Sequence, residues 1–264
     1  DDCPPVKAHN YIVTLHGVSY LVKPDLMPEL YVKKKIQWLK RIVKQADYFI
    51  AVSNNTREEF LNHFTFIDEA RISVVPLGIS PEFKELDKKQ IPGLLKSKYS
   101  IQKPYLLYVG AIAPHKNIKG IIDAFSLIAP MYEDLQLVLV GPSDKHKKHV
   151  SALTTTSNVS SRIRIIPYVS QECDILPQLY NNAQCFVFPS LTEGWTSPPL
   201  EAMACGVPVV TSNVSSLPET VGNAAFKVDP NSPEEIGAAI SKLLSDSTLR
   251  QSLIEKGFQR VKQF

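Results

Sequence analysis

Residues 184–210 read QCFVFPSLTEGWTSPPLEAMACGVPVV, an apolar run, a polar loop and a helical segment that leads into a second apolar run. The apolar run 184–188 predicts a buried strand, and the pair Pro198-Pro199 presets the first turn of the helix that follows the loop. Gly206 ends that helix, because glycine readily adopts the left-handed conformation found after many helix ends. The polar loop is therefore expected at the carboxyl end of a strand, where open parallel sheets bind their ligands.

The same alternation of short apolar runs with helical patterns continues from Tyr105 to the end of the chain. It predicts an α/β fold, because parallel strands need crossover helices between them. Strands are expected at 105–109, 135–140, 162–166, 184–188, 207–211 and 224–228, and helices at 118–128 and 174–183. Two further helices are expected to begin at Ser232-Pro233, a capping serine followed by a first-turn proline, and near Ser247.

The first hundred residues repeat this pattern in a shorter form, with strands expected at 11–15, 48–52 and 72–75 around a helix at 30–45. This amounts to half of a doubly wound domain. Residues 76–104 are rich in proline, glycine and lysine, which is typical of a linker. We therefore predict a partial N-terminal domain with its linker at 1–99 and a second domain at 100–264. The helical pattern that starts near Ser247 continues to Phe264, which suggests a chain truncated at this end.

Composition excludes several classes of function. The net charge of +3 over 264 residues is too small for a typical nucleic-acid binder, so no nucleic-acid partner is expected. No apolar run is long enough to span a bilayer, and the N-terminus lacks the pattern of a signal peptide. The four cysteines have no metal-binding or disulfide spacing, which favours a reducing compartment and predicts no metal site. Cys185 and Cys205 are expected to be small buried hydrophobes.

Two glutamates stand eight residues apart in the central motif, Glu193 in the loop and Glu201 in the first turns of the helix. A carboxylate can accept hydrogen bonds from two vicinal hydroxyl groups, one on each oxygen. Glu201 therefore suits a ribose, and Glu193 suits a sugar held beside a diphosphate. The alternative is a capping acid together with a solvated one.

This segment resembles the Glu-x7-Glu motif of the family-four retaining glycosyltransferases. The resemblance extends to residues 202–210 and, more weakly, from His16 to Phe264. It implies a GT-B fold of two Rossmann-like domains that face a cleft, with the N-terminal one incomplete here and the chain cut at both ends. It also implies transfer of a sugar from a nucleotide diphosphate donor, a GDP- or UDP-sugar, to a hydroxyl acceptor, with retention and without a metal. The acceptor would be a glycan or a lipid-linked sugar.

The resemblance assigns roles to further residues of the second domain. Gly110 and Lys116 correspond to the family's phosphate loop, with Lys116 on the donor diphosphate; the alternative is a lysine at a solvated helix start. Many members have an arginine at the places that Ala111 and His115 occupy in this chain. The central motif contributes further candidates for donor binding: Gly194, Thr196, Ser197 and Leu200. Lys116 and the helix amides near Leu200 would stabilise the leaving diphosphate, which itself helps to deprotonate the acceptor, while Glu193 holds the sugar.

His16 follows a predicted strand and resembles the acceptor-domain histidine that reaches toward the donor sugar; a histidine in this place can also be tied to a loop carbonyl. Tyr168 and Val169 follow Pro167, at a position where the family usually has a glycine in a loop that contacts the base. The segment 53–56, Ser-Asn-Asn-Thr, is expected to cap the next helix.

Residues Lys33 to Lys44 form a basic helix face opposite apolar positions. Such a face is either solvated or in contact with an anionic membrane that presents a lipid-linked acceptor. We expect a cytoplasmic protein, with peripheral membrane contact as the open alternative. Two other functions remain open: a non-catalytic sugar-nucleotide binding module or degenerate paralogue, and a nucleotide-sugar epimerase of the same fold.

Overall fold

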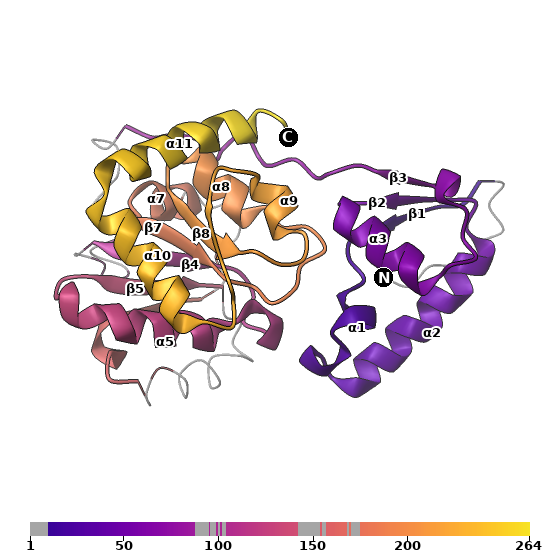
Figure 1. Cartoon of the computed structure of the whole chain (residues 1–264), viewed down its shortest axis with the longest axis horizontal. Helices are drawn as coiled ribbons and strands as arrows, with labels where there is room; N and C mark the ends of the chain where they lie inside the picture. The colour runs from indigo at the N-terminus through magenta and orange to yellow at the C-terminus, as the bar shows by residue number, and fades with distance from the viewer. Residues whose placement is uncertain are drawn as a thin grey trace. The chain divides into compact units, whose positions relative to one another are not determined.

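The computed structural model describes residues 10–87, 95, 99, 101, 104–141, 154, 157–167, 169 and 175–264. The chain forms two compact units (Figure 1). Unit 1 consists of Asp1–Leu77 together with Glu193–Trp195, and unit 2 consists of Gly78–Thr192 together with Thr196–Phe264. The domain boundary predicted near Ser100 falls on a residue outside the described ones, so it stays a prediction.

Unit 2 is built on a parallel sheet, which confirms the predicted α/β class. Within the described residues its strand order is β6-β5-β4-β7-β8-β9. Counted along the chain within this unit, the order is 3-2-1-4-5-6, that of a Rossmann fold. The strands are β4 (Tyr105–Val109), β5 (Gln136–Val140), β6 (Ile163–Ile166), β7 (Cys185–Phe188), β8 (Val209–Ser212) and β9 (Phe226–Val228).

The four central strands of this sheet, β4, β5, β7 and β8, are buried along almost their whole length. Continuous burial requires helices on both faces of a parallel sheet. One group of helices contains α5 and α10, which pack on each other, and the other contains α8 with α7, α9 and α11 (Figure 1). The helices are α5 (Ile118–Ile128), α7 (Ile175–Asn181), α8 (Pro198–Ala204), α9 (Leu217–Val221), α10 (Pro233–Ser245) and α11 (Ser247–Val261).

Several predicted boundaries are confirmed, and others shift by a few residues. Strand β4 and helix α5 have the predicted bounds. Strand β8 begins at Val209 and not at residue 207, because Pro208 has no N–H to donate to a neighbouring strand. The Ser232 hydroxyl caps α10 and accepts a hydrogen bond from the Glu235 amide at 3.1 Å, as predicted. Helix α11 ends at Val261, so the prediction that the helical pattern continues to Phe264 is wrong.

Unit 1 contains a parallel sheet in the order β1-β2-β3. Its described strands and α-helices are β1 (Ile12–Leu15), α1 (Ser19–Val22), α2 (Glu29–Gln45), β2 (Tyr48–Ala51), α3 (Asn54–His63) and β3 (Ile72–Val74). Short 3-10 turns complete the described elements of both units: η1 (Pro24–Leu26), η2 (Glu69–Arg71), η4 (Pro114–Lys116), η5 (Ala129–Met131) and η6 (Ser160–Arg162). The core between sheet and helices includes Leu39, Phe49 and Phe60, all fully buried.

Helix α2 has the two faces that the sequence indicates. Its buried side carries Val32, Leu39, Ile42 and Val43. Its basic side chains at positions 33, 34, 40, 41 and 44 are exposed. No helix among the described residues combines the length and apolar character needed to cross a membrane.

Candidate functional site

The candidate site of unit 2 lies where the order of the sheet reverses. Strand β4 pairs with β5 on one side and with β7 on the other, and the chain reaches β7 only after it has passed through β6. The crossovers that leave the two central strands therefore run in opposite directions, which leaves a crevice outside their carboxyl ends. The residues that follow β4 and β7 are Gly110 and the loop 189–197.

Two glycines bring the ends of β4 and β5 close together. Gly110 has a φ of +154° and Gly141 a φ of +119°, conformations that side-chain-bearing residues rarely adopt. A Cβ on Gly141 would lie 2.3 Å from the Gly110 carbonyl oxygen, so only glycine fits there. Gly110 was predicted as a site residue and Gly141 was not, although a glycine directly after a buried strand was a readable signal.

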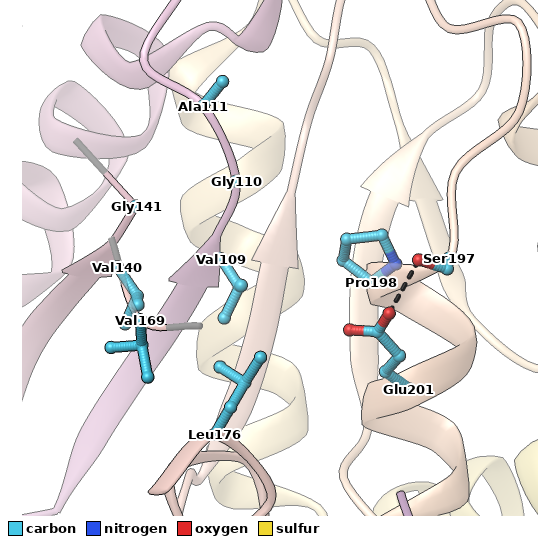
Figure 2. A pocket seen from close by; sticks show the side chains of 10 residues that line it. All are labelled: Val109, Gly110, Ala111, Val140, Gly141, Val169, Leu176, Ser197, Pro198 and Glu201. Carbon is cyan, nitrogen blue, oxygen red and sulfur yellow. Dashed lines mark hydrogen bonds between the residues drawn. The ribbon is translucent and has the colours of Figure 1, made fainter. Parts of the chain in front are cut away.

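A pocket of about 230 Å³ opens at this edge of the sheet (Figure 2). Figure 2 shows two sides of the pocket. On one side lie the apolar residues Val109, Val140, Val169 and Leu176, and across from them lie Ser197, Pro198 and Glu201 at the start of α8. Among the described residues, its lining consists of Val109, Gly110, Ala111, Val140, Gly141, Val169, Leu176, Ser197, Pro198 and Glu201. Four predicted donor-binding residues thus share one pocket: Gly110, Val169, Ser197 and Glu201. The predicted neighbour Tyr168 lies outside the described residues.

Glu201 is the charged residue among the described lining of this pocket, and it is only 4% exposed. The Ser197 hydroxyl donates a hydrogen bond to Glu201 Oε1 at 2.6 Å, drawn in Figure 2, and the Tyr180 hydroxyl donates to Oε2 at 2.8 Å. Burial raises the pKa of Glu201, these two hydrogen bonds lower it, and the charge of Glu82 raises it, with a net rise. Each carboxylate oxygen keeps a further lone pair, so the group can still accept two hydroxyl donors of a ligand.

Helix α8 positions Glu201, and its first residues determine which backbone donors it offers. Pro198 and Pro199 carry no N–H, so the amide of Leu200 is the first on the helix. Ser197 precedes the helix in a helical conformation and forms no side-chain cap with the backbone, and its hydroxyl is bonded to Glu201. Leu200 and Thr196 are both buried.

Tyr180 is a functional candidate that the sequence reasoning missed. It lies on α7, is fully buried and has its pKa raised well above the usual value, mainly by burial and then by the neighbouring Glu201 carboxylate. The ring of Phe83 meets it edge-on, with centroids 5.7 Å apart. An amphipathic pattern predicts that Tyr180 is buried but cannot predict the partner of its hydroxyl, which lies 21 residues further along the chain.

Lys116 ends the turn η4, and its Nζ lies 5.2 Å from the centre of the Phe188 ring, the last residue of β7. The next residue, Asn117, adopts a left-handed conformation with a φ of +56°. Its side chain caps α5 and donates hydrogen bonds to the carbonyl oxygens of Pro189 at 3.2 Å and Pro230 at 2.6 Å. One asparagine thus ties the lysine turn to the chain after β7 and after β9.

Two other predicted site residues, Glu193 and His16, are in unit 1. Glu193 is 7% exposed, and His16 is an exposed residue directly after β1. Gly194 lies against the backbone of His16 and Gly17: a Cβ on Gly194 would be 2.2 Å from the His16 carbonyl oxygen. The structure therefore brings the predicted His16 segment and the first glutamate of the motif together within this unit.

Cys185, Cys205 and Ser53 have the structural roles predicted for them. Cys185 and Cys205 are buried free thiols, as expected, and burial raises the pKa of each to about 12. Ser53 caps α3 by accepting a hydrogen bond from the Thr56 amide at 3.0 Å, as expected. Within the described residues, no cluster of three or more histidine, cysteine, aspartate or glutamate side chains could hold a metal ion.

Comparison with known families gives two matches along the chain. The model of the glycosyl transferases group 1 family matches residues 95–260, and that of glycosyltransferase family 4 matches residues 7–83. Together they cover both units.

Relatives from Escherichia coli share more than 30% identity with the chain, and two of them are described here. The O-antigen chain mannosyltransferase B is 33% identical over 262 residues, which cover 98% of this chain and 68% of that protein. The serotype-specific mannosyltransferase WbdA is 31% identical over 248 residues, 93% of this chain but 29% of that protein. The chain thus spans about two thirds of one relative and under a third of the other.

The solved structure of Anabaena HepE in complex with UDP-glucose has the same fold. It superposes with a TM-score of 0.80 over 96% of this chain and 68% of that one, at 18% sequence identity. This similarity confirms the GT-B architecture that the motif indicates, and at this identity it bears on the fold alone.

Proposed function

Because this chain belongs to the glycosyl transferases group 1 family, we propose that it transfers a glycosyl unit from a nucleoside-diphosphate sugar to a hydroxyl group, with retention at the anomeric carbon. The observation that carries the proposal is the buried Glu201 carboxylate at the switch point of a Rossmann-type sheet. A buried carboxylate with both oxygens already oriented is suited to a vicinal diol, and a ribose supplies one.

The donor pocket would hold the nucleoside end of the donor. Glu201 would accept the two ribose hydroxyls, with Val169 and Tyr168 next to the base. The glycine pair Gly110 and Gly141 would let the backbone approach the ligand, as glycines do in dinucleotide sites. The apolar wall of the pocket supports this role, since bases and riboses bind in pockets that are mostly apolar with few polar groups.

The leaving diphosphate would be stabilised by Lys116 and by the Leu200 amide at the start of α8. Here the bond between the anomeric carbon and the diphosphate oxygen breaks, while the bond to the acceptor oxygen forms on the same face of the sugar. The acceptor proton passes to the leaving diphosphate, so no side chain need be a strong base. A fixed cation and a fixed amide stabilise charge in the transition state without reorganising.

Glu193 and His16 are proposed to bind the transferred sugar, with Gly194, Thr196 and Ser197 completing the loop around the donor. The burial of Glu193 supports this role, because a carboxylate removed from water gains more from hydroxyl donors of a ligand than a solvated one.

We further propose that the sugar is mannose, since the two relatives described above are both mannosyltransferases. Transfer is expected to need no divalent metal, so it should persist in EDTA.

The acceptor is proposed to be a glycan or a lipid-linked sugar, and the protein to act in the cytoplasm. The exposed basic face of α2 supports contact with an anionic membrane surface that carries such an acceptor. The buried free thiols Cys185 and Cys205 are consistent with a reducing compartment.

Calorimetric titration with GDP and with UDP tests the donor site. We expect one nucleotide to bind, and Glu201→Ala to weaken binding at least tenfold, since it removes charge-assisted hydrogen bonds to the ribose. Glu234→Gln is the matched control, because Glu234 is an exposed glutamate in the first turn of another helix of unit 2.

Product analysis then separates transfer from the alternatives. Incubation with GDP-mannose and UDP-glucose, each with and without a mannosylated lipid acceptor, should give a glycosylated acceptor only when both substrates are present. An altered free donor without transfer would indicate an epimerase. Nucleotide binding without turnover would indicate a binding module and would refute the transferase proposal.

A further inference from the structure

In unit 1, the segment Glu193–Trp195 is held at its middle residue by two hydroxyl groups from the start of α3. Ser53 Oγ donates a hydrogen bond to the Gly194 carbonyl oxygen at 2.7 Å, and Thr56 Oγ1 donates to the same oxygen at 3.1 Å. Both side chains are 0% exposed. A carbonyl oxygen has two lone pairs and accepts both bonds at once.

This pair of bonds is compatible with the capping role of Ser53. The Ser53 oxygen accepts from the Thr56 amide at 3.0 Å, and its single proton remains to be donated, with the Gly194 carbonyl as the nearer acceptor at 2.7 Å. The two hydroxyl oxygens also lie 3.0 Å apart, so the Ser53 proton reaches either Thr56 Oγ1 or the Gly194 carbonyl, while the Thr56 proton is directed to that carbonyl. The backbone cap uses the Thr56 amide, so the bond from the Thr56 hydroxyl to Gly194 is an interaction beyond that cap.

The backbone of Gly194 is confined on another side by two residues after β1. A Cβ on Gly194 would lie 2.4 Å from Gly17 Cα and 2.2 Å from the His16 carbonyl oxygen, and a Cβ on Gly17 would lie 3.0 Å from Gly194 Cα. Gly194 is thus packed against glycine on one side and bonded to two hydroxyls through its carbonyl. The anchored carbonyl belongs to the peptide that joins Gly194 to Trp195, so little conformational freedom remains for Gly194, the residue that directly follows Glu193.

We propose that Ser53 and Thr56 are positioning residues for Glu193, which they hold through the carbonyl of the following residue. This inference builds on the proposed function, in which Glu193 binds the transferred sugar. A carboxylate that must meet the hydroxyls of a sugar in the transition state has to be placed within about 0.5 Å, and loops reach such precision only through a supporting shell of contacts.

Kinetics of the Thr56→Val variant test the inference. Valine keeps the shape of threonine and leaves the backbone cap by Ser53 in place, but it removes one donor to the Gly194 carbonyl and the contact of that hydroxyl with Ser53 Oγ. We expect kcat to fall by roughly tenfold, the effect of one lost hydrogen bond in the transition state, with nucleotide affinity unchanged. Thr56→Ser, which restores the hydroxyl, should recover most of the rate.

A double-mutant cycle with Glu193→Ala separates positioning from general damage. If Thr56 acts through Glu193, then Thr56→Val should have almost no further effect in the Glu193→Ala background. Equal effects in both backgrounds would overturn the proposal. For variants that include Ser53→Ala, Ser232→Ala is the control for loss of a serine cap, because Ser232 also accepts a hydrogen bond from the third amide of its helix and belongs to unit 2.

A fluorescence measurement tests the anchor without any substrate. The chain has two tryptophans, so Trp38→Phe leaves Trp195, in the anchored segment, as the sole tryptophan, whose emission is excited selectively at wavelengths that tyrosine does not absorb. The indole nitrogen of Trp195 is buried, and acrylamide quenching should increase several-fold when Ser53→Ala and Thr56→Val are combined in this background. Unchanged quenching would overturn the anchor even if transfer occurs, whereas increased quenching in a protein without transferase activity would contradict the proposed function and leave the anchor intact.

Discussion

At the scale of single residues, the protonation of Glu201 controls what the donor pocket can bind. Burial raises the pKa of this carboxyl above its ordinary value of 4.5, against the lowering effect of the hydrogen bonds from Ser197 and Tyr180. Between 4.5 and the raised pKa, the folded chain therefore holds a proton that the unfolded chain has lost. The free energy of unfolding therefore decreases as the pH rises through this window. The ionised form of Glu201, which binds a diol, thus makes the folded chain less stable.

The Tyr180→Phe variant should weaken nucleotide binding by about tenfold, because it removes a hydrogen bond that favours the charged form of Glu201. Affinity depends on ionised Glu201, so it is lost as the pH falls through the pKa of that carboxyl. Without the tyrosine hydroxyl this loss should begin at a higher pH. Calorimetric titration of the nucleotide at a series of pH values measures both effects.

Tyr105→Phe is the control for this experiment. Tyr105 is also buried in unit 2, and its hydroxyl donates to the Leu179 carbonyl oxygen at 2.6 Å and not to Glu201. It should lose some stability and leave the pH dependence of binding unchanged. If both variants shift that dependence alike, Tyr180 has no specific effect on Glu201.

At the scale of elements, the turn that carries Lys116 depends on Asn117. This one side chain caps α5 and crosslinks the chain after β7 and after β9, and its backbone is left-handed. Asparagine tolerates that conformation better than most residues, since its short polar side chain bonds locally. The strand ends around the proposed diphosphate site are thus held by side-chain bonds as well as by the sheet.

Asn117→Ala should lower the free energy of unfolding by about 3 kcal/mol, the combined effect of a lost cap, lost hydrogen bonds and a strained backbone. Urea denaturation monitored by circular dichroism measures this change. Ser232→Ala removes a cap alone and should cost about 1 kcal/mol. Equal losses for the two variants would show that the crosslinks to Pro189 and Pro230 contribute nothing.

The elements and the site differ in how well the sequence predicts them. Strands such as β4 and helices such as α5 were predictable because burial on both faces and helical periodicity are local patterns. Glu201 and Ser197 were predictable because one short motif contains both. The hydrogen bonds of the Tyr180 and Ser53 hydroxyls were not predictable. Their partners, Glu201 and Gly194, lie 21 and 141 residues further along the chain, and a local sequence pattern does not indicate contacts at such separations.

At the scale of the whole molecule, charge is distributed unevenly although the net charge is only +3. Helix α2 presents lysines and an arginine on one face, and Lys33 forms an exposed pair with Glu29 at 2.5 Å. Exposed pairs contribute little to stability. The basic face is therefore available for electrostatic attraction to an anionic surface.

Replacing Lys33, Lys34 and Lys40 together by glutamine should reduce sedimentation with vesicles of anionic phospholipid by more than tenfold, since each basic residue near such a surface contributes roughly 1 kcal/mol. Binding of the unmodified protein should weaken as salt is raised. The control replaces the exposed lysines Lys227, Lys256 and Lys262 of unit 2, with the same change in net charge. Equal losses from both triples would indicate attraction by net charge alone and would favour a solvated α2.

The packing of Glu193–Trp195 into unit 1 also affects how such proteins can be recombined. A crossover after Leu77 joins the first unit of one relative to the second unit of another. That crossover would separate Gly194 from the Ser53 and Gly17 with which it packs. A working hybrid must therefore take residues 193–195 from the same parent as its first unit, although the rest of its second unit comes from the other parent. These three residues lie within the sequence of unit 2 but belong structurally to unit 1.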